Sequence, residues 1–247
     1  MPRPQHCPER AAAATARAFA DGAYAGCTAH QLRSHGNAMA GALQWADAST
    51  LYSLALAAVE RGAEASESGA KAGAAPDPAP EPHKLLSNRS LAHLRLAQEA
   101  SAREDEAVRG AARDGAAPRP LARLPDLMEA QGPDLVIGTT PISAEQEARG
   151  MRLSQAYRAL AFADARRAAR LSPRWAKAHG RLGEAAREIG LASLATGDEH
   201  GVVVMKACAV DAFRAAAELQ PSDGGFAEAA VRVEKELSAD ANGSYES

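Results

Sequence analysis

Small and apolar residues recur every three or four positions through most of the chain, which is the spacing of one face of an α-helix. Ala161, Ala165 and Ala168 are typical. Two stretches lack this pattern and are rich in proline, which disrupts helix interiors: residues 63–82 and 115–141. The pattern predicts helices at 28–44, 47–61, 83–112, 151–171, 174–190, 203–219 and 225–238.

The composition narrows the fold class further. Alanine accounts for 62 of the 247 residues, whereas only ten residues are aromatic. Alanine has the highest helix propensity, and strands favour the aromatic and β-branched residues that are scarce here. We therefore expect an all-α fold of closely packed helices. No run of about 18 apolar residues occurs, so the sequence predicts no membrane-spanning helix.

Small residues, aromatic residues and prolines recur in the same order at three places. Two of these places end on a proline, Pro173 or Pro221, that follows an alanine-rich helix. The recurring positions are Gly36, Met39, Trp45, Ala48, Tyr52 and Ala55 in the first place, Ala161, Ala165, Ala168 and Trp175 in the second, and Ala209, Phe213 and Ala216 in the third. This order resembles the tetratricopeptide repeat (TPR), a 34-residue pair of antiparallel helices.

The resemblance implies a right-handed superhelix of about three TPR helix pairs and a C-terminal capping helix, within a domain at residues 28–238. Small residues would lie where two helices approach closely, with a large residue of the neighbour filling the gap. The implied segments are a partly helical N-terminal extension at 1–27, repeat one at 32–62, a linker at 63–82, repeat two at 83–173 with a long irregular insertion at 98–152, repeat three at 174–221 with an insertion at 191–203, the capping helix at 225–238 and a disordered tail at 239–247.

Three short sequences on the first helices of these repeats carry polar residues at a matching spacing: RSHGN, LLSNRS and WAKAHGR. Residues four apart lie on the same face of a helix, and the first helix of each TPR lines the concave face. The polar residues are Arg33, Asn37, Asn88, Lys177 and Arg181. They resemble the carboxylate clamp of chaperone-binding TPR proteins, a family that includes heat-shock organising protein. Arg33 stands where that family normally has lysine, and its longer, planar group is not equivalent to an ammonium.

The resemblance implies a ligand, the acidic Glu-Glu-Val-Asp tail of heat-shock protein 70 or heat-shock protein 90. A peptide that ends in aspartate presents two neighbouring carboxylates, which accept several hydrogen bonds. Lysine and arginine donate charge-assisted bonds, and asparagine amides donate without adding charge. The chain is therefore interpreted as a non-catalytic adaptor or co-chaperone with no cofactor and no metal.

The distribution of charge agrees with an acidic ligand. Residues 152–187 carry nine Lys or Arg and two acids, a net charge of +7 in a chain whose total is −3. An acidic partner would be attracted to that stretch. Residues 99–149 carry ten acids and six bases, and our hypothesis is that this segment partly screens the groove.

Two other functions stay open. The chain could be a general TPR scaffold for another acidic peptide or subunit, unrelated to chaperones, or a nucleic-acid-binding helical protein that uses the basic stretch. The few aromatic residues and the net negative charge disfavour nucleic acid. An enzyme is not expected, because HExxH, paired CxxC, GxSxG and phosphate-loop motifs are absent and His35 has no second histidine at ligand spacing.

The cysteines indicate a compartment. Cys7, Cys27 and Cys208 are odd in number and show no CxxC spacing, which favours a reducing environment such as the cytoplasm over a disulfide framework. The arginines and alanines of the N-terminus are typical of an organellar presequence, but its prolines and the acidic Glu9 and Asp21 argue against one.

Overall fold

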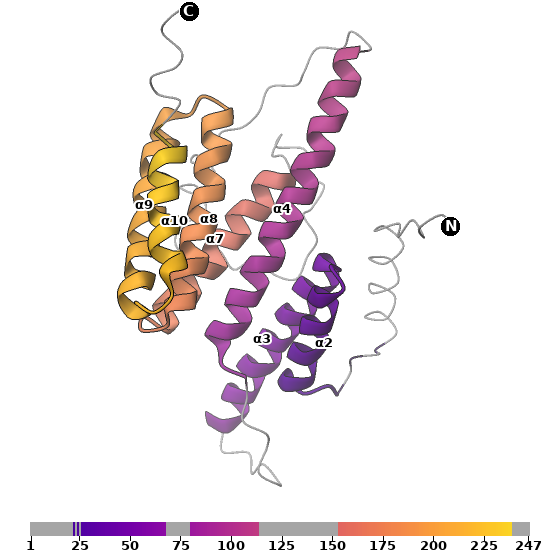
Figure 1. The fold of residues 1–247 in the computed structure, drawn as a ribbon. Coiled ribbons are helices and arrows are strands. Elements are labelled where there is room, and N and C mark those ends of the chain that lie inside the picture. Colours follow the sequence, from indigo (N-terminus) through magenta and orange to yellow (C-terminus); the bar gives the residue numbers. More distant parts are fainter. Residues whose placement is uncertain (1–21, 23, 25, 68–79, 114–152, 239–247) are drawn as a thin grey trace, which may run out of the picture.

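The computed structural model describes residues 22, 24, 26–67, 80–113 and 153–238. Across these residues the secondary structure is entirely helical and contains no strand, so the predicted all-α fold class is confirmed (Figure 1). The helices are α2 (Ala29–Gly41), α3 (Trp45–Glu67), α4 (Pro82–Arg113), α7 (Leu153–Leu171), α8 (Ala176–Ala195), α9 (Glu199–Leu219) and α10 (Gly224–Glu236). None of them is long and apolar enough to cross a membrane.

Each described helix packs against the next described helix along the chain, which gives a series of helix pairs. In Figure 1 the series runs from α2 and α3 at one end to α9 and α10 at the other. Alternate helices also meet: α4 packs on α8, and a hydrogen bond from Asn88 to Asn37 joins α4 to α2. The helices α2, α4 and α8, which carry the five predicted site residues, therefore adjoin one another in that order.

Some predicted boundaries differ from the structure. The segment expected as an insertion at 191–203 is mostly helical, because α8 continues to Ala195 and α9 begins at Glu199. Only a tight turn separates them, in which Gly197 has a φ of +72° and the Asp198 side chain accepts a hydrogen bond from the Gly201 N–H. The extra residues lengthen two helices, which alanine and leucine allow without a break.

Two other irregular segments also begin later than predicted. The linker expected at 63–82 overlaps α3, which continues to Glu67, and the insertion expected at 98–152 overlaps α4, which continues to Arg113. The rest of those two segments, most of the N-terminal extension and the predicted tail lie outside the described residues.

The small positions lie where helices meet, as predicted. Six alanines of the recurring pattern are fully buried, with none of their surface exposed: Ala48, Ala55, Ala161, Ala168, Ala209 and Ala216. Two glycines also lie where helices approach closely, and no larger residue fits at either position. A Cβ on Gly36 would lie 2.7 Å from the ring of Tyr52, and one on Gly183 would lie 2.8 Å from the ring of Phe213. Both aromatic side chains are buried, so only glycine allows these helices to approach so closely.

A buried polar network links three of the helices behind these contacts. Arg89 of α4 donates two hydrogen bonds to Asp164 of α7, from Nε to Oδ2 at 2.8 Å and from Nη2 to Oδ1 at 2.6 Å. Its Nη1 also donates to Ser53 of α3 at 3.0 Å. His93 lies between Ser49 and Asp164, with its Nε2 2.8 Å from the serine hydroxyl and its Nδ1 3.3 Å from the carboxylate. These contacts fix the rotation of α4, the helix that carries Asn88.

Candidate functional site

The amides of Asn37 and Asn88 are in direct contact although 51 residues separate them in the chain. Asn88 Nδ2 donates to Asn37 Oδ1 at 3.2 Å, and the hydroxyl of Tyr52 donates to the same oxygen at 2.9 Å. Tyr52 is only 2% exposed, whereas Asn37 is exposed and Asn88 is half-buried. A hydrogen-bonded amide pair thus lies at the surface of α2 and α4 and rests on a buried phenol.

Arg33 lies one helical turn before Asn37 and is half-buried. Its positive charge acts on Glu81, which lies just before α4. The pKa of the Glu81 carboxyl is lowered mainly by a hydrogen bond from Lys84 and to a smaller extent by the charge of Arg33. Lys84 donates to Glu81 at 2.8 Å, and His83 lies 3.0 Å from the same carboxylate. The cationic side chains of Arg33 and Lys84 and the imidazole of His83 therefore lie near one exposed acid.

The start of α8 is held against the start of α4 by an aromatic contact. The rings of His83 and Trp175 meet edge to face, with 4.8 Å between their centroids. Burial lowers the pKa of His83 and outweighs the opposing charge of Glu81, so this ring is neutral at pH 7 and packs as an apolar group. Lys177 follows two residues after Trp175, on the first turn of α8, and is exposed.

Arg181 is already engaged by an acid on its own helix. Its Nη1 donates to Glu184 at 2.5 Å, and its side chain is 19% exposed against 45% for that of Glu184. The Nε of Arg181 is buried and has no hydrogen-bond partner among the described residues. The described contacts therefore bring Asn37 and Asn88 together, but they include no hydrogen bond from either amide to Lys177 or Arg181.

Beyond Arg181, a groove of about 490 Å³ opens between α4, α8 and α10. Arg95 and Arg232 border it with Arg181 and Glu184, and Leu91, Phe213 and Phe226 supply apolar surface. The ring of Phe226 lies against Gly180, where a Cβ would come within 2.5 Å of it. Gly180 thus allows α10 to close one side of the groove, one residue before a predicted site residue.

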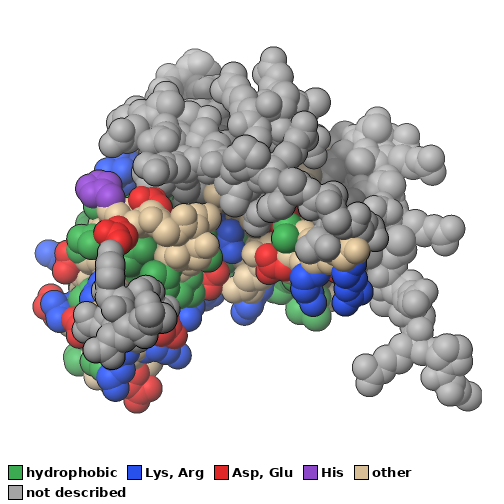
Figure 2. Space-filling view, turned by 90° about the horizontal axis from the view of Figure 1, so that it is seen from above, with side chains coloured by type: hydrophobic (Ala, Val, Ile, Leu, Met, Phe, Trp, Pro, Cys, Tyr) green, Lys and Arg blue, Asp and Glu red, His purple; other side chains and the backbone are tan. Residues whose placement is uncertain are grey.

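The strongly basic stretch predicted at 152–187 does not form a single positive surface. Arg187 donates to both oxygens of Glu236 at 2.6 and 3.0 Å, which raises the pKa of the arginine and lowers that of the acid. Arg158 is partly buried near Glu188, and burial lowers its pKa. On the part of the described surface that is visible in Figure 2, Lys and Arg side chains lie among Asp and Glu side chains. The net charge of +7 therefore overstates the attraction for an acidic partner.

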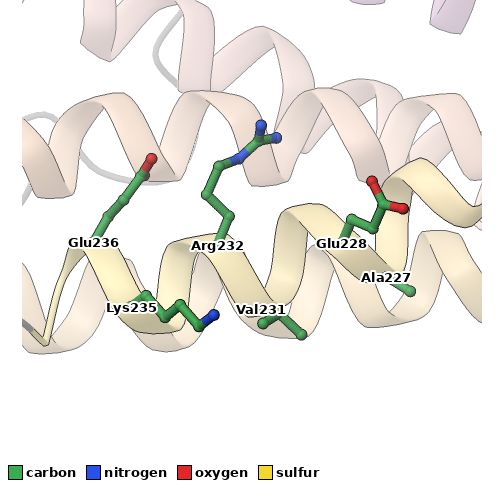
Figure 3. A pocket seen from close by; sticks show the side chains of 6 residues that line it. All are labelled: Ala227, Glu228, Val231, Arg232, Lys235 and Glu236. Atoms are coloured by element: carbon green, nitrogen blue, oxygen red, sulfur yellow. The ribbon is translucent and has the colours of Figure 1, made fainter.

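A second hollow runs along the outside of α10 and has a volume of about 640 Å³ (Figure 3). Glu228, Arg232 and Glu236 project from one side of the helix, and Ala227 and Val231 project from another. All of its lining residues come from α10. Because no second element directs polar groups into it, this hollow is a weaker candidate than the groove bordered by three helices.

Comparisons of this chain with protein-family models, with curated proteins and with solved structures find no match. Within the described residues, no group of three or more His, Cys, Asp or Glu side chains is placed to hold a metal ion. The best indication of function is therefore the arrangement of the polar side chains along α2, α4 and α8.

The sequence did not reveal two residues of this site. Tyr52 belongs to the recurring pattern of small and aromatic residues, and no sequence signal shows that its hydroxyl reaches Asn37. Glu184 follows Arg181 by three positions, a spacing that places two side chains together on a helix and could have indicated the ion pair. Trp175 and Phe213, two other aromatic residues of the recurring pattern, pack between helices.

Proposed function

We propose that this protein is a carboxylate-clamp TPR module that binds the acidic C-terminal tail of a chaperone, heat-shock protein 70 or heat-shock protein 90. In this proposal α2 with α3, α4 with α7, and α8 with α9 are the three helix pairs of a right-handed superhelix, and α10 is the capping helix. The observation that supports it best is the hydrogen bond between Asn37 and Asn88, two predicted clamp residues from different helix pairs.

The chemistry of the site suits a peptide that ends in a free carboxylate. The amide pair offers neutral N–H donors, and Arg33 on α2 and Lys177 at the start of α8 offer positive charge. Arg181 retains donor groups beyond the one that binds Glu184. Two adjacent carboxylates accept several hydrogen bonds, which the amide pair and the cationic side chains together can donate. Charge-assisted hydrogen bonds are stronger than those between neutral groups.

The groove between α4, α8 and α10 gives the rest of the peptide a place to bind. Arg181 belongs both to the clamp and to the border of this groove, so a chain anchored at the clamp continues into it. Its arginines suit the glutamates that precede the terminal valine and aspartate, and Leu91 and Phe226 suit an apolar side chain further upstream.

The proposed protein acts without catalysis, cofactor or metal, as a cytoplasmic adaptor. A general TPR scaffold that takes another acidic peptide uses the same donors and differs only in the partner. Nucleic-acid binding is disfavoured, because several arginines of the basic stretch are paired with glutamates or half-buried.

Calorimetry with a peptide that ends in Glu-Glu-Val-Asp tests the proposal. Lys177→Ala/Arg181→Ala should weaken binding by about 2 kcal/mol or more, because truncation leaves a bound carboxylate without its charged donors. Arg166→Ala/Arg170→Ala is the matched control, since it also removes two charges of the basic stretch but from exposed positions on α7. It should change the affinity less than about threefold. Equal losses in the two double variants would show non-specific attraction, and no loss in either would reject the clamp.

A further inference from the structure

The hydrogen bonds beneath the amide pair determine which atoms it presents to solvent. A planar amide has a carbonyl oxygen with two lone pairs and a nitrogen with two N–H groups. Asn37 Oδ1 accepts one hydrogen bond from Tyr52 at 2.9 Å and another from Asn88 at 3.2 Å. Both of its lone pairs are therefore used, and the described residues include no acceptor for Asn37 Nδ2, which is left to donate outward.

The opposite orientation of this amide would oppose an anionic ligand. If the amide of Asn37 were rotated by half a turn, its oxygen would face the ligand, and a carbonyl oxygen repels a carboxylate. Asn88 alone does not prevent that rotation, because its own amide can rotate and accept instead of donate. A phenol hydroxyl can donate or accept, but in the structure the hydroxyl of Tyr52 donates to Asn37 Oδ1, and this hydrogen bond favours the observed arrangement over the rotated one.

The surroundings of Tyr52 hold that hydroxyl in place. The side chain is 2% exposed, and its ring lies against Gly36, the residue before Asn37. Burial raises the pKa of the phenol, and a hydrogen bond with the Asn88 side chain only partly opposes this, so the hydroxyl keeps its proton at neutral pH. It therefore donates to Asn37 Oδ1 and accepts from the Asn88 side chain.

From these contacts we infer that Tyr52 is a positioning residue for ligand binding: its hydroxyl occupies Asn37 Oδ1 and so turns the N–H groups of Asn37 toward a peptide carboxylate. This inference rests on the proposed function. Tyr52 itself does not touch the ligand, and it affects peptide affinity only by orienting the amide of Asn37. The effect of losing the hydroxyl should therefore depend on whether Asn37 is present.

A double-mutant cycle measures that dependence. Calorimetry with the Glu-Glu-Val-Asp peptide should show that Tyr52→Phe weakens binding about three- to tenfold, the worth of one oriented hydrogen bond. In the Asn37→Ala background the same change should cost less than about twofold, because no amide remains to be oriented. Tyr157→Phe is the matched control: Tyr157 is half-buried on α7, stacks on His93 and should leave the affinity unchanged.

The outcomes separate this inference from the clamp itself. If Asn37→Ala weakens binding and Tyr52→Phe does not, the positioning role is rejected and the clamp stands. If the two losses simply add, Tyr52 acts through stability and the inference is also rejected. If Asn37→Ala and Lys177→Ala/Arg181→Ala both bind like the wild type, the proposed function fails.

A second measurement keeps the inference testable if Tyr52→Phe unfolds. In the nitrogen-15 NMR spectrum of the wild-type protein, the side-chain amide of Asn37 should give one pair of signals, and addition of the peptide should shift them strongly. Signals that do not respond to the peptide, while the backbone signals of Lys177 do, would overturn the orientation argument.

Discussion

The two halves of the proposed clamp are built differently. At the α2 and α4 end, the amides of Asn37 and Asn88, here called the neutral half, are tied to a buried phenol, with the Arg89 and Asp164 ion pair behind them. Arg33, one turn before Asn37, is the charged clamp residue at this end and is not counted in the neutral half. At the α8 end the groups are charged and partly exposed, and Arg181 already has a carboxylate partner in Glu184.

This difference suggests a division of labour. The neutral half is rigid and contributes direction, because its donors are fixed by buried contacts that a ligand does not disturb. The charged half attracts the carboxylates of the ligand, but some of its charge is neutralised by acidic residues of the protein itself. Salt screens the remaining attraction. The predictions below, in order of decreasing effect, test whether the two halves respond differently.

The largest effect should come from the ion pair behind the neutral half. Arg89→Ala leaves Asp164 charged and buried without its bidentate partner, and should lower the free energy of unfolding by about 3–5 kcal/mol. The matching change at the other end, Glu236→Ala, breaks the more exposed pair with Arg187 and should cost about 1 kcal/mol or less. Urea denaturation measures both, and equal losses would contradict the comparison.

The same ion pair predicts sensitivity to acid. Burial alone would raise the pKa of Asp164, but the charge and hydrogen bonds of Arg89, with those of His93, outweigh it and lower the pKa below its usual value. A lowered folded-state pKa stabilises the fold fully above the unfolded pKa of about 3.9, and this contribution is lost as the pH falls through the lower folded value. The wild type should therefore lose stability below about pH 4, and Asp164→Asn should lose less over the same range. Parallel pH profiles for the two proteins would contradict this.

Two glycines allow a matched test in the two halves. Gly36→Ala and Gly183→Ala each place a Cβ under 3.0 Å from a buried aromatic ring, so each should destabilise the fold by about 1–3 kcal/mol. Only Gly36→Ala displaces Tyr52, and it should also weaken binding of the Glu-Glu-Val-Asp peptide in calorimetry below the unfolding temperature. An equal loss of affinity in Gly183→Ala would mean that general loosening is responsible.

The dependence of peptide affinity on salt concentration should differ between variants of the two halves. Lys177→Ala removes a charge, so it should weaken peptide binding by about 1–2 kcal/mol and flatten the dependence of affinity on salt concentration. Asn37→Ala should weaken binding by about 1 kcal/mol and leave that dependence unchanged, because it removes a neutral donor. Titrations at low and high salt give both values, and equal slopes for the two variants would remove the proposed distinction.

The smallest effect concerns the internal partner of Arg181. Glu184→Gln removes a carboxylate that competes with the ligand for this arginine, and should strengthen peptide binding by up to about 1 kcal/mol. Glu228→Gln, on the outer hollow of α10, is the control and should have no effect. A weaker complex for Glu184→Gln would mean that Glu184 orients Arg181 for the ligand.

The sequence was sufficient where structure follows from local pattern. Helical spacing and the small residues predicted the helices and their close contacts, and alanines such as Ala161 and Ala209 are buried as expected. Helix ends were harder, because residues 191–203 contain two glycines, Gly197 and Gly201, and only Gly197 lies between the helices. Contacts between distant residues, such as Arg89 with Asp164, depend on the packing of α4 against α7 and leave no trace in either segment alone.

The same limit applies to the candidate site. The spacing of Asn37, Asn88 and Lys177 indicated a shared face, but orientation and pairing required the structure. It adds the hydroxyl of Tyr52 beneath the amides and the carboxylate of Glu184 beside Arg181.

The most direct test of the clamp compares two peptides with the same sequence on the full-length chain. One ends in Glu-Glu-Val-Asp with a free terminal carboxylate, and the other carries a terminal carboxamide. The clamp requires both carboxylates of the terminal aspartate, so the amidated peptide should bind at least about tenfold more weakly. Equal affinities of the two peptides in calorimetry would contradict the proposal that these helices recognise a chain terminus.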